Sequence, residues 1–234
     1  MKEIPGKQRT IKSFVRREGR LTKSQQHALD HYWKKYGIDY KPEMLDFIGV
    51  FNRRAPLIMD IGVGTGDTTL NHAKLHPENN YLAIDVHRPG IGHLLNQIEL
   101  DQLSNVKIIN YDVMNVLQDQ LSDHSISQIF IFFPDPWPKK RHHKRRLINQ
   151  PLIDLIINKL TRHGRLHIAT DWSDYAEHIN KICHPESGLI NLTGRNLFAP
   201  RPEWRVNTRY ESRGLNLKHN VWDFCFGLNQ KTKS

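Results

Sequence analysis

Leu57-Ile58-Met59-Asp60-Ile61-Gly62-Val63-Gly64-Thr65-Gly66-Asp67 is the stretch of this 234-residue chain that decides its fold. A run of strand length, apolar except for one carboxylate, leads directly into three alternating glycines, and we expect a helix from there to about His76. We interpret the stretch as a buried strand, a tight turn and a helix start. Because a tight turn alone could explain the glycines, this interpretation needs support from elsewhere in the chain.

Strand–turn–helix units of this kind hold nucleotides in Rossmann-like folds. A dinucleotide fingerprint, G-x-G-x-x-G, would need glycine where Asp67 stands. The observed spacing of Gly62, Gly64 and Gly66, with Asp60 two residues before the first glycine, is the pattern of sheets that bind S-adenosylmethionine. This cofactor has no phosphate, and its cationic methionine end tolerates a nearby carboxylate. We therefore predict S-adenosylmethionine as the cofactor.

Two further predicted strands lead to carboxylates. The strand at residues 81–84 is followed by Asp85. The number of residues between the glycine turn and Asp85 is close to that expected for an acid that accepts hydrogen bonds from ribose hydroxyls. A helix is expected from Pro89 to about Gln102. The next strand, 105–109, precedes Asp112. Asp112 could accept from the adenine amino group, although a helix cap is the commoner role for an acid in this position.

The fourth predicted strand, residues 129–133, carries the residues for chemistry. It runs into Pro134-Asp135-Pro136-Trp137-Pro138 and then into 139–146, which hold six basic residues, two histidines and no acid. Ligands of open α/β sheets bind just past the carboxyl ends of the strands. A carboxylate, an indole and a cationic strip at such a place indicate chemistry on a nucleic-acid base. The alternative is a strand followed by a solvated basic loop.

The charge of the chain, +10 in all, is concentrated in two segments. Residues 1–23 hold eight basic and two acidic residues, and 139–146 hold the second cluster, so the remaining chain is close to neutral. Such clusters favour a polyanionic partner. No run approaches the ~18 apolar residues of a membrane span, and the first residues lack the apolar core of a signal peptide.

Cysteine and histidine usage adds little chemistry. Cys183 and Cys225 are far apart in sequence, and we expect both to be buried packing residues of a cytoplasmic protein. The pairs His27/His31, His72/His76 and His163/His167 have helical spacing but no HExxH pattern and no cysteine cluster nearby. We therefore predict structural or surface roles for them and no metal site.

The rest of the chain completes one domain. Residues 1–26 are expected to form a basic, mobile N-terminal arm, and residues 27–234 a single domain. The arm either contacts phosphates or closes over the site; the alternative is a disordered tail. The other expected elements are helices at 24–36 (with Ser24 as N-cap), 41–51 (entered through Pro42) and 147–160 (ending towards Gly164), a strand at 165–169 leading to Asp171, loops at 184–200, a functional loop at 201–214 and a closing strand at 221–226.

With these motifs in place, the chain resembles the bacterial tRNA (guanine-N7)-methyltransferases over most of its length. The proline-aspartate-proline-tryptophan block with its basic run is the most specific of the motifs. The blocks that carry the resemblance are Arg17-Glu18-Gly19-Arg20, Asp60 to Gly66, Asp85 to Gly92, Phe132 to Trp137, Thr170 to Ala176, Thr208 to Gly214 and Val221-Trp222-Asp223.

The resemblance implies a Rossmann-like α/β fold, that of class I methyltransferases, with a mostly parallel seven-stranded sheet flanked by helices. It implies S-adenosylmethionine as methyl donor, S-adenosylhomocysteine as product and a guanine in the tRNA variable loop as acceptor. The partner would be tRNA, with neither DNA nor a membrane, and the chain would be a monomer or a homodimer.

The resemblance also implies residue roles. The cofactor would be lined by Asp60, Gly62, Gly64, Gly66, Asp85, Asp112 and Asp135, of which Asp135 would also be catalytic. Substrate or RNA contacts would come from Lys139, Arg141, His142, His143, Lys144, Arg145, Arg146, Asp171, Thr208, Arg209, Tyr210 and Glu211. Two mild departures are Asp60 in place of the usual glutamate and Arg209-Tyr210 in place of the commoner lysine-phenylalanine.

Three other functions remain open at this point. A non-enzymatic RNA-binding protein could retain such a core without binding the cofactor. A nicotinamide oxidoreductase is disfavoured by Asp67 and by the absence of an evident hydride partner. A methyltransferase acting on proteins or small molecules would have no obvious use for the two basic clusters.

Overall fold

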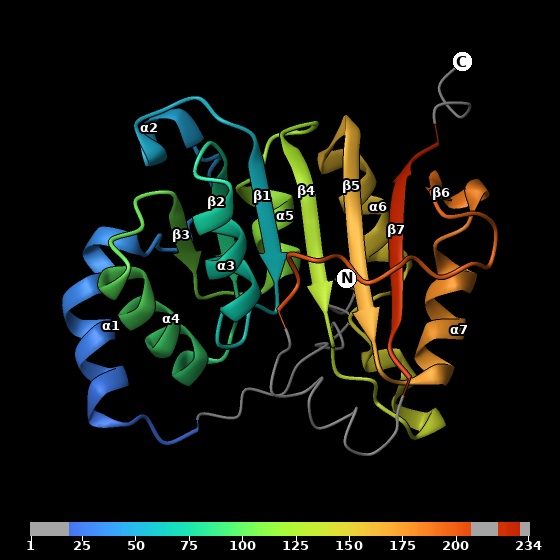
Figure 1. Ribbon diagram of the computed structural model, residues 1–234, viewed down its shortest axis with the longest axis horizontal. Helices are drawn as coiled ribbons and strands as arrows, with labels where there is room; N and C mark the ends of the chain where they lie inside the picture. Colours follow the sequence, from blue (N-terminus) through green and yellow to red (C-terminus); the bar gives the residue numbers. More distant parts are fainter. Residues whose placement is uncertain (1–18, 207–219, 230–234) are drawn as a thin grey trace, which may run out of the picture.

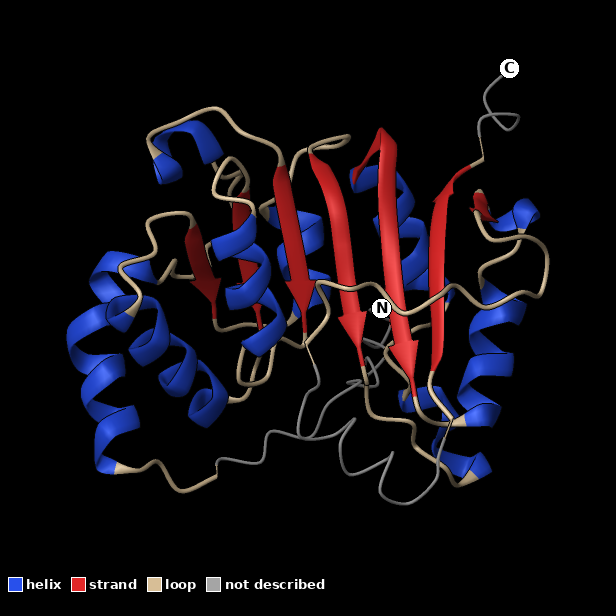
Figure 2. Cartoon of the chain, in the orientation of Figure 1, coloured by secondary structure: helices blue, strands red, loops and turns tan. Residues whose placement is uncertain are grey.

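The computed structural model describes residues 19–206 and 220–229, and within them one seven-stranded sheet forms the centre of the molecule (Figures 1 and 2). The strand order is β3-β2-β1-β4-β5-β7-β6. Neighbours are parallel from β3 through β5, and β7 pairs antiparallel with both β5 and β6. The predicted mostly parallel, Rossmann-like sheet is therefore confirmed.

The strands are β1 Leu57–Ile61, β2 Asn80–Ile84, β3 Val106–Ile109, β4 Ile126–Phe132, β5 Leu160–Thr170, β6 Leu189–Asn191 and β7 Trp222–Leu228. The helices are α1 Lys23–Tyr36, α2 Phe47–Phe51, α3 Asp67–Leu75, α4 Arg88–Leu100, α5 Val113–Asp119, α6 Gln150–Lys159 and α7 Ser173–Ile182, with 3-10 helices η1 Lys140–Arg145 and η2 Pro185–Ser187.

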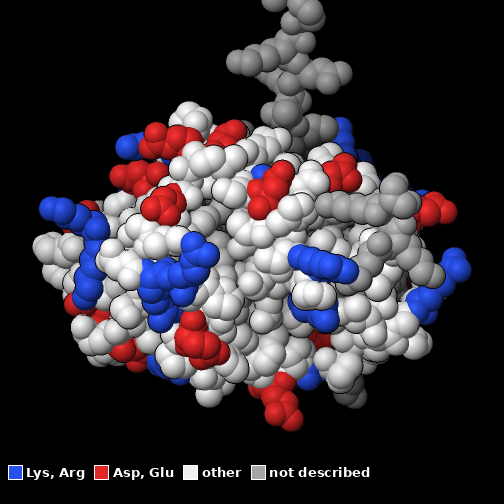
Figure 3. Space-filling model, turned by 90° about the horizontal axis from the view of Figure 1, so that it is seen from above, with Lys and Arg blue, Asp and Glu red and all other residues white. Residues whose placement is uncertain are grey.

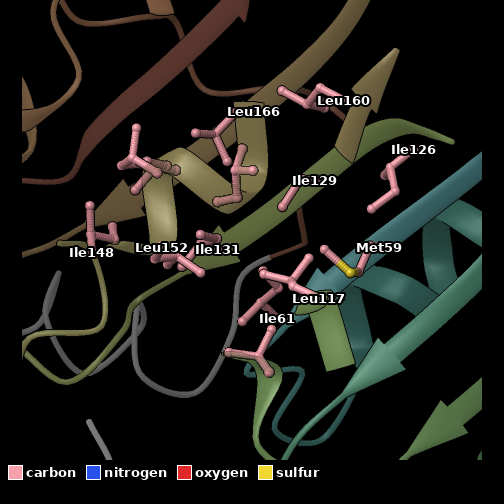
Figure 4. Close-up of a cluster of buried hydrophobic side chains, with 14 of the residues drawn as sticks. Met59, Ile61, Leu117, Ile126, Ile129, Ile131, Ile148, Leu152, Leu160 and Leu166 are labelled. Atoms are coloured by element: carbon pink, nitrogen blue, oxygen red, sulfur yellow. The ribbon is translucent and has the colours of Figure 1, made fainter. Parts of the chain in front are cut away.

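Helices cover both faces of the sheet, which explains why β1 and β2 are buried along their whole length. Buried side chains of α1, α3 and α4 pack with Ile58, Tyr81 and Phe130 on one face. Those of α5, α6 and α7 pack with the other face, where Met59, Ile129 and their neighbours form the larger apolar cluster (Figure 4).

The boundaries of three helices differ from the expectations. Helix α1 is capped by Thr22 through a capping box with Gln25, rather than by Ser24, so it overlaps the end of the segment assigned to the arm. Helix α2 is short because the chain enters it through the Asp46 cap and not through Pro42. Helix α6 ends at Lys159, since β5 already pairs with β4 at Leu160.

Strands β4 and β5 begin at Ile126 and Leu160, earlier than the predicted positions 129 and 165. The other differences lie where the sequence predicted no element. Strand β6, helix α7 and the 3-10 helices η1 and η2 were not expected. Cys183 is buried, as expected, whereas Cys225 on β7 is only partly buried, and both are free thiols. Within residues 19–206 and 220–229, no helix has the length and apolar character needed to cross a membrane.

Candidate functional site

The carboxylates and glycines singled out by the sequence lie along one edge of the sheet. The glycine turn follows β1, Asp85 follows β2, and Asp112 comes soon after β3. Asp135 and Asp171 follow β4 and β5 in the same way. Because these five strands are parallel, their carboxyl ends meet at one edge, where the arrowheads point in Figure 1.

The opposite edge of the sheet carries charges of both signs. Seen from above in Figure 3, it carries acidic and basic side chains interspersed with one another. The basic run is instead attached to the carboxyl end of β4 through residues 133–139. The cationic strip and the five strand ends therefore belong to the same side of the molecule.

The glycine turn is shaped by two different requirements. Gly62 and Gly66 have φ values of +77° and +82°, a conformation that residues with a Cβ rarely adopt. A Cβ on Gly66 would lie 2.4 Å from Cδ1 of Leu94 on α4, whereas a Cβ on Gly62 would meet nothing within 4 Å. Gly66 thus serves helix packing, and Gly62 leaves open space beside the backbone that a ligand can use.

Asp85 joins the ends of β1 and β2. Its Oδ2 accepts a hydrogen bond from Gly64 N at 2.8 Å, and its Oδ1 accepts one from His87 N at 2.9 Å. A carboxylate offers about four acceptor positions, so each oxygen retains capacity for another donor. This geometry fits the predicted contact with ribose hydroxyls.

Asp60 lies deeper than an open cofactor site would require. Its side chain accepts from the Thr69 hydroxyl of α3, and the residue is only 5% exposed. Burial raises its pKa to about 7; the Thr69 hydrogen bond opposes this rise, and the nearby Asp85 charge adds to it. Asp60 therefore connects β1 to α3 behind the glycine turn.

Asp112 performs the commoner of its two predicted roles. It is the N-cap of α5, with Oδ1 accepting from Met114 N at 3.0 Å. The preceding residue, Tyr111, stacks on Tyr40 with ring centroids 3.8 Å apart. The cap fixes Asp112 at the strand edge and leaves its second oxygen for another donor.

The turn that carries Asp135 has an unusual backbone. Phe133 and Trp137 have φ values of +50° and +45°, in the left-handed region that bulky residues avoid. Asp135 itself is exposed, and Phe133 N donates to Ala169 O of β5 at 2.8 Å. Such strain persists only where the surroundings hold it, and it is common at functional sites.

Trp137 packs against the basic run. Its ring meets His142 edge-on with centroids 5.9 Å apart, and the Arg145 guanidinium lies 5.1 Å from the ring centroid. The indole Nε1 is buried and has no hydrogen-bond partner among the described residues. Burial, assisted by the charges of Arg141 and Arg145, lowers the pKa of His142.

The basic run divides into exposed and buried cations. Lys139, Arg141 and Lys144 are exposed, whereas the Arg146 side chain is only 1% exposed. Arg146 was predicted to contact RNA, but its guanidinium is directed into the protein and paired there, so we remove it from the phosphate-binding set.

Other predicted residues have mixed outcomes. Asp171 is partly buried between β5 and α7. Among the histidine pairs, His72 has a structural role: it is buried, with Nδ1 2.7 Å from the Tyr81 hydroxyl, and burial lowers the pKa of His72 to about 4.

No group of three or more potential metal ligands occurs in the described residues. The substrate block Thr208, Arg209, Tyr210 and Glu211 and most of the arm, residues 1–18, lie outside the described residues.

Sequence reasoning missed the roles of Trp204 and Arg205. The segment 199–206 crosses one face of β7, β5 and β4 (Figure 1), and we call it the strap. Trp204 stacks on Phe130 with centroids 4.7 Å apart, and buried Arg205 pairs with Asp223 of β7 at 2.9 Å. The strap, the sheet and the loop residues Leu192 and Thr193 line an open groove of about 540 Å³. In the sequence, the adjacent Trp204 and Arg205 within an otherwise polar loop were the signal that could have indicated a packed segment here.

Comparisons with known proteins give a consistent result. A family model described as "Putative methyltransferase" matches residues 54–224. A tRNA (guanine-N(7)-)-methyltransferase of Hydrogenovibrio crunogenus is 43% identical over 96% of this chain and 93% of its own length. Those of Nitrosospira multiformis and Alkalilimnicola ehrlichii are 46% identical (95% of this chain, 96% of theirs) and 47% identical (93% and 92%).

Solved structures agree on the fold. The 16S rRNA methyltransferase KamB superposes with a TM-score of 0.59 over 80% of this chain and 94% of its own, at 12% identity. An rRNA methylase from Streptococcus thermophilus gives 0.52 over 75% and 88%, at 13% identity. At these identities the likeness concerns the fold alone.

Proposed function

Because the chain belongs to the family of tRNA (guanine-N(7)-)-methyltransferases, enzymes that take their methyl group from S-adenosylmethionine, we propose that its own acceptor is a guanine in the tRNA variable loop. One observation carries the proposal: the glycine turn, the exposed Asp135 and the exposed cations of the basic run gather at the same edge of the sheet. This edge can receive a cofactor and an RNA side by side.

The residues at this edge fit the cofactor. The open space beside Gly62 and the backbone of the turn would receive the methionine end. The remaining acceptor capacity of Asp85 would hold the ribose, and the free oxygen of Asp112 would accept from the adenine. When bound, the cofactor supplies an electrophilic methyl group on its sulfonium.

Guanine N7 needs little help from a base. It carries a lone pair and no proton, so no residue must deprotonate it, but methylation leaves the ring positively charged. We propose that the Asp135 carboxylate accepts from the Watson–Crick edge of the guanine and stabilises that charge. Holding N7 in line with the methyl group can contribute ~7–11 kcal/mol. A loop guanine reaches such a site at lower cost than one in a duplex.

The remaining contacts follow from position and charge. Asp171, at the end of the neighbouring strand β5, is proposed to contact the substrate. Lys139, Arg141 and Lys144 are exposed and suited to phosphates. The proposal places the enzyme in the cytoplasm, where its tRNA is found, and accommodates either a monomer or a homodimer.

The decisive experiment incubates the protein with labelled S-adenosylmethionine and unmodified tRNA, digests the RNA and identifies the labelled nucleoside. We expect 7-methylguanosine, and we expect the label to disappear when the variable-loop guanine of the transcript is replaced by adenine. Label that persists in that transcript would contradict the variable-loop assignment. A relict RNA-binding protein would bind no S-adenosylmethionine in calorimetry.

Asp135 is tested in the same assay. Asp135→Ala should abolish methyl transfer, because the transition-state charge loses its partner, while tRNA affinity remains close to that of the wild type. Asp154→Ala, an exposed position on α6, is the control for loss of one carboxylate. Near-normal turnover of Asp135→Ala would exclude the assigned role.

A further inference from the structure

Arg146, the last cation of the basic run, is buried although its neighbours are exposed or half-exposed. Its side chain is 1% exposed, and it is among the largest fully buried side chains of the described protein. A buried guanidinium requires partners that satisfy its charge and its N–H groups.

These partners come from two loops of the site. Arg146 Nε donates to the carbonyl oxygen of Pro136 at 2.9 Å, next to Asp135. Its Nη2 pairs with the carboxylate of Asp174 in the first turn of α7, and this pairing lowers the pKa of Asp174. The guanidinium carbon also lies 4.8 Å from the centroid of the Tyr175 ring.

The Asp135 turn needs such support. Phe133 and Trp137, on either side of Asp135, have left-handed φ values of +50° and +45°. A backbone of this kind holds its shape only when its surroundings fix it. Phe133 N is anchored on Ala169 O of β5, and the Pro136 carbonyl, on the other side of Asp135, is anchored by Arg146.

The second loop carries the other substrate carboxylate. Asp171 follows β5, and α7 begins at Ser173 with Asp174 and Tyr175 in its first turn. Tyr175 is itself fixed, because its hydroxyl accepts from Ile148 N at 3.1 Å. Arg146 thus lies between the turn that presents Asp135 and the helix start that follows Asp171.

We propose that Arg146 is a positioning residue, which holds the Asp135 turn against the start of α7 so that Asp135 and Asp171 keep a fixed relative position at the guanine site. It acts through the Pro136 carbonyl and Asp174 and makes no contact with RNA. This inference rests on the proposed function, because the two carboxylates matter only if the guanine binds between the strand ends.

The test compares Arg146→Gln with two matched variants that remove one positive charge. Lys144→Gln lies in the same run and is exposed, and Lys181→Gln lies on the exposed side of α7. For Arg146→Gln, kcat should fall roughly tenfold to a hundredfold, since a small misplacement of a catalytic group has effects of that size. Its tRNA Kd and the salt dependence of that Kd should stay at wild-type values.

Lys144→Gln should show the opposite pattern, with weaker tRNA binding and a shallower salt dependence, and Lys181→Gln should match the wild type. A shallower salt dependence for Arg146→Gln would mean that Arg146 meets a phosphate. An unchanged kcat would mean that it positions nothing. Either result overturns the inference.

Asp174→Asn provides the same test if Arg146→Gln fails to fold. The Asp174 side chain is 53% exposed; it pairs with Arg146 and also lies 3.6 Å from His143 Nε2, so its replacement removes both contacts. It should lower kcat without affecting tRNA affinity, and an unchanged kcat overturns the inference. An active wild type with unimpaired variants contradicts only this inference, whereas an inactive wild type overturns the proposed function and the inference with it.

Discussion

Asp60 shows how one buried group makes stability depend on pH. Its pKa is raised from 3.8 to about 7, mainly by burial, so the folded protein holds this proton more tightly than the unfolded chain does. The stability that Asp60 contributes is therefore fully present below its unfolded pKa and is lost as pH rises through about 7. Asn at this position stays neutral. Between pH 3.8 and about 7, the free energy of unfolding of Asp60→Asn should therefore rise relative to the wild type by about 1 kcal/mol for each pH unit.

The measurement is urea unfolding of both proteins at several pH values across the window. The exposed variant Asp154→Asn reports the effect of removing a surface carboxylate. Parallel stability curves for wild type and Asp60→Asn would show that Asp60 ionises normally in the folded protein.

At the residue scale, the sequence placed the carboxylates correctly but not their surroundings. Asp85 and Asp135 could be assigned to strand ends because Asp85 follows an apolar run directly and Asp135 follows one after Pro134. The burial of Arg146 could not be predicted, since its partner Asp174 lies 28 positions away in sequence. Asp60 was expected at an open site because nothing in its own neighbourhood indicates that Thr69 covers it.

At the scale of elements, the turn between β1 and α3 offers a matched pair of substitutions. Gly62→Ala and Gly66→Ala impose the same left-handed strain, but only the second forces a Cβ into Leu94. We expect Gly66→Ala to lose about 1–3 kcal/mol more stability in urea unfolding than Gly62→Ala, from overpacking. Gly62→Ala should instead lose S-adenosylmethionine affinity in calorimetry, because the new methyl group occupies open space at the site. Equal stability losses would contradict the packing role of Gly66.

Elements with a strong local pattern were predictable, and those defined by distant partners were not. Strands β1 and β2 are apolar runs interrupted only by Asp60 and Asn80, and α3 follows its glycine turn directly. Strand β6 has three residues, and its pairing with β7 determines it. Helix α7 did carry a signal, since Tyr175, Ala176 and Ile179 have helical spacing and are all buried.

At the scale of the whole molecule, the strap connects parts of the chain that are far apart in sequence. Trp204 O accepts from Asn71 of α3 at 2.9 Å, and the Trp204 ring contacts Phe130 of β4. Ala199 N donates to Asp223 O of β7 at 2.7 Å. The strap therefore links the helix behind the glycine turn, the strand that leads to Asp135 and the closing strand. The Trp204–Arg205 pair marks the segment in the sequence, but it does not indicate which distant elements these side chains meet.

The Arg205–Asp223 pair is the buried anchor of this connection, with side chains 0% and 7% exposed. Removing one partner of a buried ion pair costs about 3–5 kcal/mol. We expect Asp223→Asn to lower the free energy of unfolding by about 3 kcal/mol. The melting temperature should then fall by about 6–12 °C, at the rate typical of a chain of this size.

The double variant Arg205→Met/Asp223→Leu should recover much of this loss, because it removes both charges and leaves apolar side chains next to Phe132 and Phe133, the rings that the guanidinium faces. Asp30→Asn, on the exposed side of α1, should melt like the wild type. A wild-type melting temperature for Asp223→Asn would show that the stability of the fold does not depend on this ion pair.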